Sequence, residues 1–143
     1  MSNKSQGTAF EREFAEVLAD YGFWAHCMKD NQNGQPFDII AARSGATYVF
    51  DCKDCQGSIF QLSRIEENQH NAMLLWNSTG NGQGLFAIRF MGEIYVIPHW
   101  VLIEQRECGI KQMSQINIQQ YGQSFECWIK NRNGVDEWIK GCR

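Results

Sequence analysis

Apolar side chains recur with helical spacing in the first part of the chain. Between residues 5 and 21 they return every three or four positions and form one stripe: Phe10, Phe14, Val17, Leu18 and Tyr21. This periodicity predicts an amphipathic helix over residues 5–21, and Gly22 is a residue type that ends helices. The short apolar run at residues 23–28 predicts a strand, and the polar, turn-rich residues 29–36 predict a loop.

Two further apolar runs flank a short turn and predict a β-hairpin. The strands cover residues 37–42 and 47–53, and the turn covers residues 43–46. A second helix is predicted over residues 62–76 because Ser63-x-x-Glu66 has the spacing of a capping box. Strands follow at residues 85–90 and 94–97 around a turn, and Pro98-His99-Trp100 opens another predicted helix.

The C-terminal part, residues 107–143, is rich in glutamine and fits either a hairpin or a strand with a short helix. A turn is predicted at residues 131–134. The order of the preceding elements, α-β-β-β-α-β-β, predicts an α/β fold with a central mixed β-sheet flanked by helices. The whole chain, residues 1–143, is expected to form a single domain with a core of about residues 5–106 and a C-terminal extension over residues 107–143.

The composition is that of an ordinary globular domain, with 43% hydrophobic and 20% charged residues. No apolar run reaches the ~18 residues of a membrane span, and the start of the chain lacks a signal-peptide core. We therefore expect no membrane association and a cytoplasmic location. The net charge of −3 disfavours nucleic-acid binding through a basic surface. Acidic sites that hold a divalent cation are the exception, because the ion supplies the positive charge.

The chain has six cysteines: Cys27, Cys52, Cys55, Cys108, Cys127 and Cys142. Without a secretory signal, free buried thiols are the expected state. Cys52 and Cys55 have C-x-x-C spacing, but a second pair for zinc is missing, and Cys52 lies within a strand pattern rather than at a helix start. A redox or zinc protein built on this pair is therefore an outlying alternative.

Charged residues interrupt the second strand of the predicted hairpin. If the turn is centred on its Ser-Gly pair, Asp38 lies opposite Asp51 and both project to the same side as Lys53. An odd-length loop would shift this register by one residue. Two carboxylates about 5 Å apart repel by roughly 3 kcal/mol at an effective dielectric of about 20, so a cation is expected between them. A hard divalent ion such as Mg²⁺ fits better than Lys53 alone; a plain ion pair at a strand end is the alternative.

Three motifs resemble a known superfamily. "PFDII" at residues 36–40, followed by "DCK" at residues 51–53, resembles the signature of the PD-(D/E)xK nucleases. "GTAFERE" at residues 7–13 resembles the opening helix of Holliday-junction resolvases in this superfamily, which include archaeal and Gram-positive bacterial types. "FQLSRIEENQHNAM" at residues 60–73 resembles a helix of the bacterial type that carries a Gln, here Gln69.

The resemblance implies a restriction-endonuclease-like fold and a metal-dependent DNA endonuclease, most closely a Holliday-junction resolvase. It implies that Mg²⁺ or Mn²⁺ is held by Asp38, Asp51 and the backbone carbonyl of Cys52, with Glu11 binding the ion directly or through a water. Glu13 is the alternative to Glu11. Lys53 would orient the attacking water, and Gln69 would position the water or the phosphate. The implied partners are branched DNA, in particular a four-way junction, and a second copy in a homodimer.

Two features depart from the resolvase pattern. The chain between Gly22 and Asp38 has no room for the stalk insertion of the bacterial type, and Asp51 stands where those families usually have Glu. A nuclease of the same fold that acts on nicks, flaps or a specific sequence is therefore an alternative, as is a non-catalytic module that binds nucleic acid or protein. Thr8-x-x-Glu11 also has capping-box spacing.

Several other residues have ordinary structural explanations. Core positions are expected for one histidine and three tryptophans: His26, Trp100, Trp128 and Trp138. Structural or exposed positions are expected for His70 and His99. Lys29 and Arg64 are candidates for phosphate contacts, although single basic residues more often belong to a solvated surface.

Overall fold

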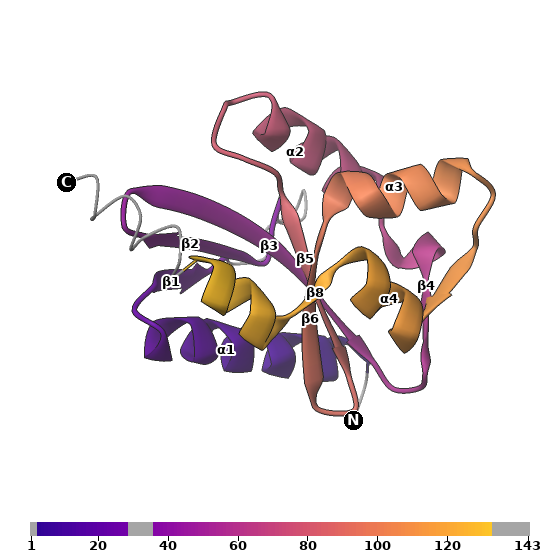
Figure 1. Cartoon of the computed structure of the whole chain (residues 1–143), viewed down its shortest axis with the longest axis horizontal. Helices are drawn as coiled ribbons and strands as arrows, with labels where there is room; N and C mark the ends of the chain where they lie inside the picture. The colour runs from indigo at the N-terminus through magenta and orange to yellow at the C-terminus, as the bar shows by residue number, and fades with distance from the viewer. Residues whose placement is uncertain (1–2, 29–35, 133–143) are drawn as a thin grey trace.

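A six-stranded mixed β-sheet forms the centre of the molecule (Figure 1). The computed structural model describes residues 3–28 and 36–132. The strands lie in the order β1-β2-β3-β5-β6-β8, and β3 and β5 are parallel while the other neighbouring pairs are antiparallel. Their bounds are β1 (Trp24–Cys27), β2 (Ile39–Arg43), β3 (Ala46–Cys55), β5 (Leu85–Phe90), β6 (Glu93–Pro98) and β8 (Gln123–Ser124). The expected α/β fold with a central mixed sheet is confirmed.

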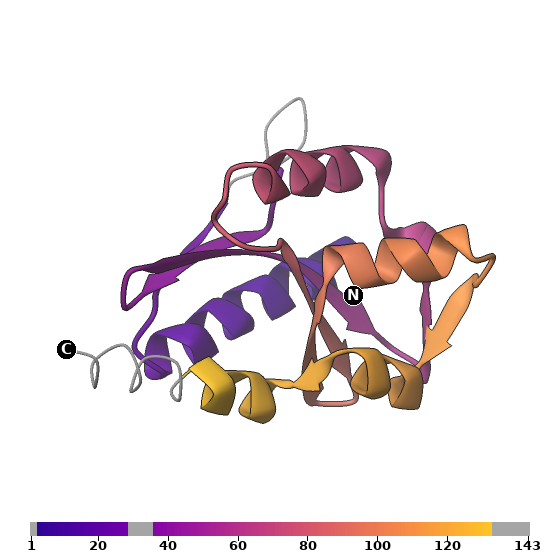
Figure 2. The same ribbon diagram turned by 45° about the horizontal axis from the view of Figure 1, so that its top comes forward.

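Helices cover both faces of this sheet, as Figure 2 shows. The helix α1 (Asn3–Asp20) packs Phe10, Phe14 and Leu18 into a core on one face, and residues 125–132 add a helix there. The helices α2 (Glu67–Asn77), α3 (His99–Glu107) and α4 (Gln115–Tyr121) contribute to the core on the other face. Within residues 3–28 and 36–132, none of the helices combines the length and apolar character that crossing a membrane requires.

The predicted hairpin forms with the predicted register. Ile40 pairs with Val49, and the strands are joined by a two-residue turn at Ser44-Gly45. Both turn residues have positive φ, 52° and 82°, which is the conformation that matches the twist of the flanking strands. The alternative prediction of an odd-length loop, which would have shifted the register by one residue, is therefore wrong. One strand is longer than predicted, because β3 continues to Cys55 by pairing with β5.

The segment after β3 differs from the prediction. A short strand β4 (Ile59–Gln61) pairs with β7 (Gln112–Ser114), and a 3₁₀ turn η1 (Leu62–Arg64) follows. The helix α2 then begins at Glu67 rather than at residue 62. Its capping box is formed by Glu66 and Gln69 rather than Ser63 and Glu66. The helix start was predicted wrongly because two capping-box spacings overlap. Gln69 can fill the third helical position after Glu66 just as Glu66 can fill it after Ser63.

The described part of residues 107–143 contains β7, α4, β8 and a further helix over residues 125–132. Of the two interpretations, the strand with a short helix is therefore closer than the hairpin. The predicted turn at residues 131–134 is wrong at its first two positions, which are helical, and the rest of it lies outside the described residues. Trp138 also lies outside them.

Candidate active site

The strands β2 and β3 separate where the two aspartates lie. The β2–β3 ladder ends at Ile39 and Phe50, and the Asp38 N–H still donates to the Phe50 carbonyl at 3.0 Å. Beyond this point β3 runs on to Cys55 with β5 as its partner. The site residues of β3 therefore lie just past the fork, where one side of the strand has lost its neighbour.

Asp38 and Asp51 are buried together at this fork, with exposed fractions of 6% and 1%. Asp38 Oδ2 accepts a hydrogen bond from the Cys52 N–H at 2.7 Å, which orients that carboxylate. Neither carboxylate oxygen of Asp51 accepts a hydrogen bond within the described part of the chain. Burial raises the pKa of Asp51 well above its ordinary value, and the adjacent Asp38 carboxylate, to which a protonated Asp51 can donate, raises it further. A bound cation would relieve this repulsion.

Lys53 lies beside the aspartate pair and is held from α2. Its Nζ is 3.8 Å from Asp51 Oδ1 and donates to Gln69 Oε1 at 3.1 Å. The same Gln69 oxygen accepts a hydrogen bond from the Glu66 N–H at 3.1 Å. The predicted site residue Gln69 thus joins Lys53 to the first turn of α2.

The two candidate acids of α1 have different surroundings. Glu11 is half-buried and influences the aspartate site through its charge. The pKa of Asp51 is raised mainly by the burial of Asp51 itself, and the charge of Glu11 raises it further. The Cys27 Sγ–H also approaches the Glu11 backbone carbonyl, at 3.7 Å. Glu13 instead makes an ion pair with Arg89. Because α1 already begins at Asn3, Thr8 is interior to the helix, and the capping-box explanation of Glu11 is wrong.

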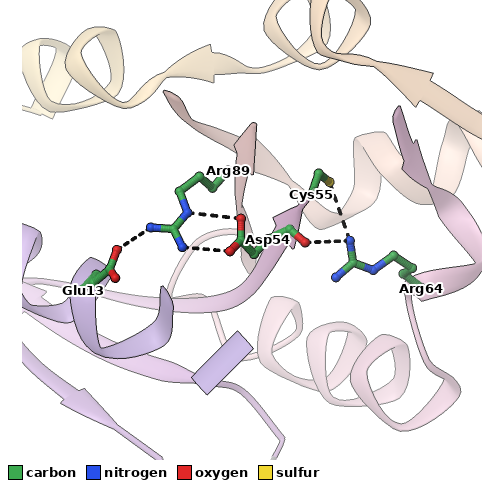
Figure 3. Close-up of polar contacts among 5 residues, drawn as sticks. All are labelled: Glu13, Asp54, Cys55, Arg64 and Arg89. Atoms are coloured by element: carbon green, nitrogen blue, oxygen red, sulfur yellow. Dashed lines mark hydrogen bonds and ion pairs between the residues drawn. The ribbon is translucent and has the colours of Figure 1, made fainter. Parts of the chain in front are cut away.

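Arg89 on β5 links α1 to β3, an arrangement that Figure 3 shows. Its guanidinium makes a two-pronged contact with Asp54, with Nε–Oδ1 at 3.1 Å and Nη2–Oδ2 at 2.8 Å, and its third nitrogen, Nη1, reaches Glu13. On the other side of Asp54, Arg64 donates to the Asp54 backbone carbonyl at 3.2 Å. Arg89 and Asp54 were not singled out in the sequence, because nothing local marks residues 35 positions apart as partners.

The site fits a magnesium-like ion through two carboxylates rather than through a ready-made cage. Within residues 3–28 and 36–132, no three His, Cys, Asp or Glu side chains lie close enough together to hold a metal ion. Mg²⁺ usually keeps several waters and needs only one or two carboxylates. Asp38 and Asp51 supply these, and the unbonded oxygens of Asp51 are suitable ligand atoms. Glu11 is not one of these two carboxylates.

Comparison with known proteins identifies the family. The family model for archaeal Holliday junction resolvases (Hjc) matches residues 2–130. The chain belongs to this family. It is 26% identical over 97 residues to the crossover junction endodeoxyribonuclease Hjc of Methanocaldococcus jannaschii, and the match covers 68% of each chain.

The fold comparison agrees with this assignment. The crystal structure of Archaeoglobus fulgidus Hjc, a Holliday junction resolvase from an archaeal hyperthermophile, superposes with a TM-score of 0.65. The two chains are 16% identical, and the match covers 87% of this chain and 98% of the other. The restriction-endonuclease-like fold implied by the sequence motifs is thereby confirmed, and the matching family is the archaeal type.

The cysteines of this Hjc-family chain are free thiols, as expected, within the described residues. Cys52 contributes to the core that contains α1, whereas Cys55 contributes to the core on the opposite face. They therefore cannot share a metal ion or form a disulfide, and burial raises the pKa of both thiols. The expectation of burial is wrong for Cys108 and Cys127, which are exposed, and Cys142 lies outside the described residues.

Two residues that were expected in the core are exposed instead. Trp128 is buried as expected, but Trp100 is 50% exposed, and His26 is exposed and stacks on Trp24 on the edge strand β1. An apolar pattern on a strand or helix does not by itself imply burial, because burial depends on whether another element covers that position. His99 is buried and hydrogen-bonded to His70, a structural role. Lys29 lies outside the described residues.

Proposed function

We propose that this chain is a metal-dependent DNA endonuclease that resolves Holliday junctions by paired, symmetric cuts. The observation that carries the proposal is the buried Asp38–Asp51 pair with the Lys53 ammonium beside it, at the fork of the sheet in a fold that matches Archaeoglobus fulgidus Hjc. Two carboxylates buried together are costly while both are charged, and a cation between them removes that cost. A site of that kind is suited to a phosphodiester, whose hydrolysis needs charge neutralised and a water activated.

The proposed metal ligands are Asp38, Asp51 and the Cys52 carbonyl, with Glu11 acting directly or through a water. At these residues, Mg²⁺ or Mn²⁺ would supply Lewis-acid activation of the scissile phosphate and of the attacking water. The backbone N–H of Cys52 fixes the Asp38 carboxylate, so one ligand is oriented in advance. Lys53 orients the attacking water and donates a hydrogen bond to the phosphate oxygen where charge develops. Gln69 holds the Lys53 ammonium in place for these two contacts, with the water and with the phosphate oxygen.

Two symmetric cuts require two sites, which a twofold homodimer would supply. Leu74 and Leu75 on α2 are 51% and 71% exposed, and burying them against a second copy would remove apolar surface from water. Residues 1–143 would act as one nuclease domain, with about residues 5–106 as the core and residues 107–143 as an extension. The proposed location is cytoplasmic.

The test compares a synthetic four-way junction, a nicked duplex, a flap and a plain duplex, each incubated with the protein in Mg²⁺ and then in Mn²⁺. Asp51→Asn removes a ligand charge, and Lys53→Ala removes the ammonium. Glu126→Gln is the matched control, because it removes an exposed acid from the helix over residues 125–132.

The expected result is a pair of symmetric cuts in the junction, lost in Asp51→Asn, in Lys53→Ala and in EDTA but kept in Glu126→Gln. Preferential cutting of nicks, flaps or duplex would retain the chemistry and replace the substrate. Folded protein that binds the junction without cutting it in either metal would instead support the non-catalytic binding module. Measuring the protein mass in solution with and without the junction tests the homodimer separately.

A further inference from the structure

Four residues from three elements meet at Arg89: Phe10 and Glu13 from α1, Asp54 from β3 and Arg89 itself from β5. We call this set the Arg89 clamp. The guanidinium forms its two-pronged contact with Asp54, pairs with Glu13 and lies over the Phe10 ring with 4.4 Å to the ring centroid (Figure 3 shows the polar contacts). One planar cation thus engages both the end of β3 and one face of α1.

The clamp touches residues that flank the proposed site on both elements. On β3, Asp54 directly follows Lys53, and on α1, Phe10 directly precedes Glu11. Phe10 is fully buried, and the side chains of Arg89 and Asp54 are 19% and 12% exposed. The clamp therefore fixes the part of α1 that carries Glu11 against the strand that carries the aspartate and the lysine.

We propose that the Arg89 clamp is a positioning device that sets the place of Glu11 relative to Asp51 and Lys53, with Glu13 as its polar contact on α1. The inference rests on the proposed function, because it depends on Glu11 acting at the metal site. It assigns different tasks to the two acids of the opening helix: Glu11 faces the metal, and Glu13 holds the helix in place.

Two features favour positioning over a purely stabilising role. The apolar stripe of α1 is already buried through Phe10, Phe14 and Leu18, and an ion pair to a side chain as exposed as Glu13, at 57%, adds little to stability. A planar guanidinium with two parallel hydrogen bonds does, however, define geometry closely. Metal affinity and reaction rate depend on ligand placement far more steeply than stability does.

The decisive variant is Glu13→Gln, which removes the charge that pairs α1 with Arg89 and leaves the Asp54–Arg89 contact and the Phe10 contact in place. Glu16→Gln is the matched control, because it removes the same charge from an exposed position on the same helix. Mn²⁺ affinity is measured by titration calorimetry on the full chain without DNA, and Tm is measured in parallel. We expect Glu13→Gln to raise the Kd for Mn²⁺ by about 3- to 10-fold, Glu16→Gln to leave it within about 2-fold, and both to keep a wild-type Tm.

A double variant separates positioning from general charge effects. If Glu13 acts through Glu11, Glu13→Gln adds nothing to the Kd once Glu11→Gln is present. An undiminished effect of Glu13→Gln in that background would overturn the inference, as would a Kd for Glu13→Gln equal to that of Glu16→Gln. Arg89→Lys provides a second route: it keeps the charge but lacks the fork, and it should raise the Kd to a similar extent as Glu13→Gln.

The same measurements separate this inference from the proposed function. If Glu11→Gln alone leaves the Mn²⁺ affinity unchanged, Glu11 has no role at the metal, and both the site assignment and the clamp's role fail. If Glu11→Gln weakens Mn²⁺ binding and junction cutting while Glu13→Gln and Arg89→Lys do neither, the proposed function stands and the positioning role is overturned.

Discussion

Gln69 accepts a hydrogen bond from the Lys53 ammonium across 3.1 Å. The same side-chain oxygen accepts the N–H of Glu66, so the capping box of α2 and the hold on Lys53 depend on one amide group. A helix terminus is a rigid support for a side chain to which we assign a contact with the phosphate. The contact gives Gln69 a partner on β3 that the sequence motif alone did not indicate.

Replacing Gln69 should slow the cutting of the junction without weakening the binding of the junction. We expect Gln69→Ala to lower kcat for junction cutting by about 10- to 100-fold, because Lys53 loses its support, while the Kd for the junction stays unchanged. Loss of the capping box should lower the free energy of unfolding by about 1 kcal/mol. Single-turnover cleavage and urea unfolding measure the two effects. Gln69→Glu keeps an acceptor oxygen and should retain most of the rate; a wild-type rate in Gln69→Ala would contradict the proposed role.

The buried aspartate pair should make the metal-free wild-type protein less stable than the Asp51→Asn variant. Burial and Asp38 raise the pKa of Asp51 above its ordinary value of 3.8. For an acid whose pKa is raised in the folded state, stability is lost as pH increases from the ordinary value through the raised one. At pH 7.5 in EDTA, Asp51→Asn should therefore exceed wild type in unfolding free energy by about 1–2 kcal/mol. Urea titrations at pH 5 and 7.5 test this, since the difference between the two proteins should grow with pH.

A divalent metal ion should make wild type more stable than Asp51→Asn, the reverse of the order expected in EDTA. Ligand that binds only the folded state stabilises it by about 2.7 kcal/mol when present at 100 times its Kd. Mg²⁺ at that excess should raise the Tm of wild type and leave the Tm of Asp51→Asn nearly unchanged, because the variant lacks one carboxylate of the pair. Glu126→Gln, the control from the opposite face, should respond as wild type does. Equal shifts in all three proteins would place the metal elsewhere.

His99 should make stability fall in mildly acidic solution. Burial, together with the charges of His70 and Arg106, lowers the pKa of His99 from 6.5 to about 4. Its Nε2 is 2.9 Å from His70 Nδ1, and its ring stacks on Phe86. For a histidine whose pKa is lowered in the folded state, stability is full above 6.5 and is lost as pH falls toward 4.

We therefore expect the free energy of unfolding to drop by up to about 3 kcal/mol between pH 7 and pH 4, beyond any change caused by the carboxylates. His99→Gln should show a flatter pH dependence over the same range, although its stability at pH 7 will be lower because the His70 contact is altered. Equal slopes in wild type and His99→Gln would show that this histidine does not titrate as described.

The parts of the site that depend on local pattern could be predicted from the sequence. A two-residue turn at Ser44-Gly45 fixes the pairing of β2 with β3, so the opposition of Asp38 and Asp51 follows from alternation along the strands. The helical stripe of α1 likewise follows from spacing alone. The motifs at these positions also indicate the resolvase family without any information on the fold.

Contacts between distant segments could not be predicted in this way. Glu13 and Arg89 are 76 positions apart, and β4 pairs with β7 across the intervening α2, β5, β6 and α3; nothing in a local window marks either pairing. The start of α2 was misplaced because two overlapping capping spacings compete, and tertiary packing of the 3₁₀ turn decides between them. Exposure of Trp100 and His26 likewise depends on which sheet edges and helix faces stay uncovered.

The most direct test of the central claim uses a supercoiled plasmid that extrudes a cruciform, a four-way junction held in closed DNA. Two cuts made by paired sites convert the plasmid to linear DNA, whereas single cuts relax it to nicked circles. In Mg²⁺, we predict linear product from wild type and none from Asp51→Asn or from wild type in EDTA. Intact plasmid after incubation with folded wild type, in Mg²⁺ and in Mn²⁺, would contradict the assignment of this site to junction resolution.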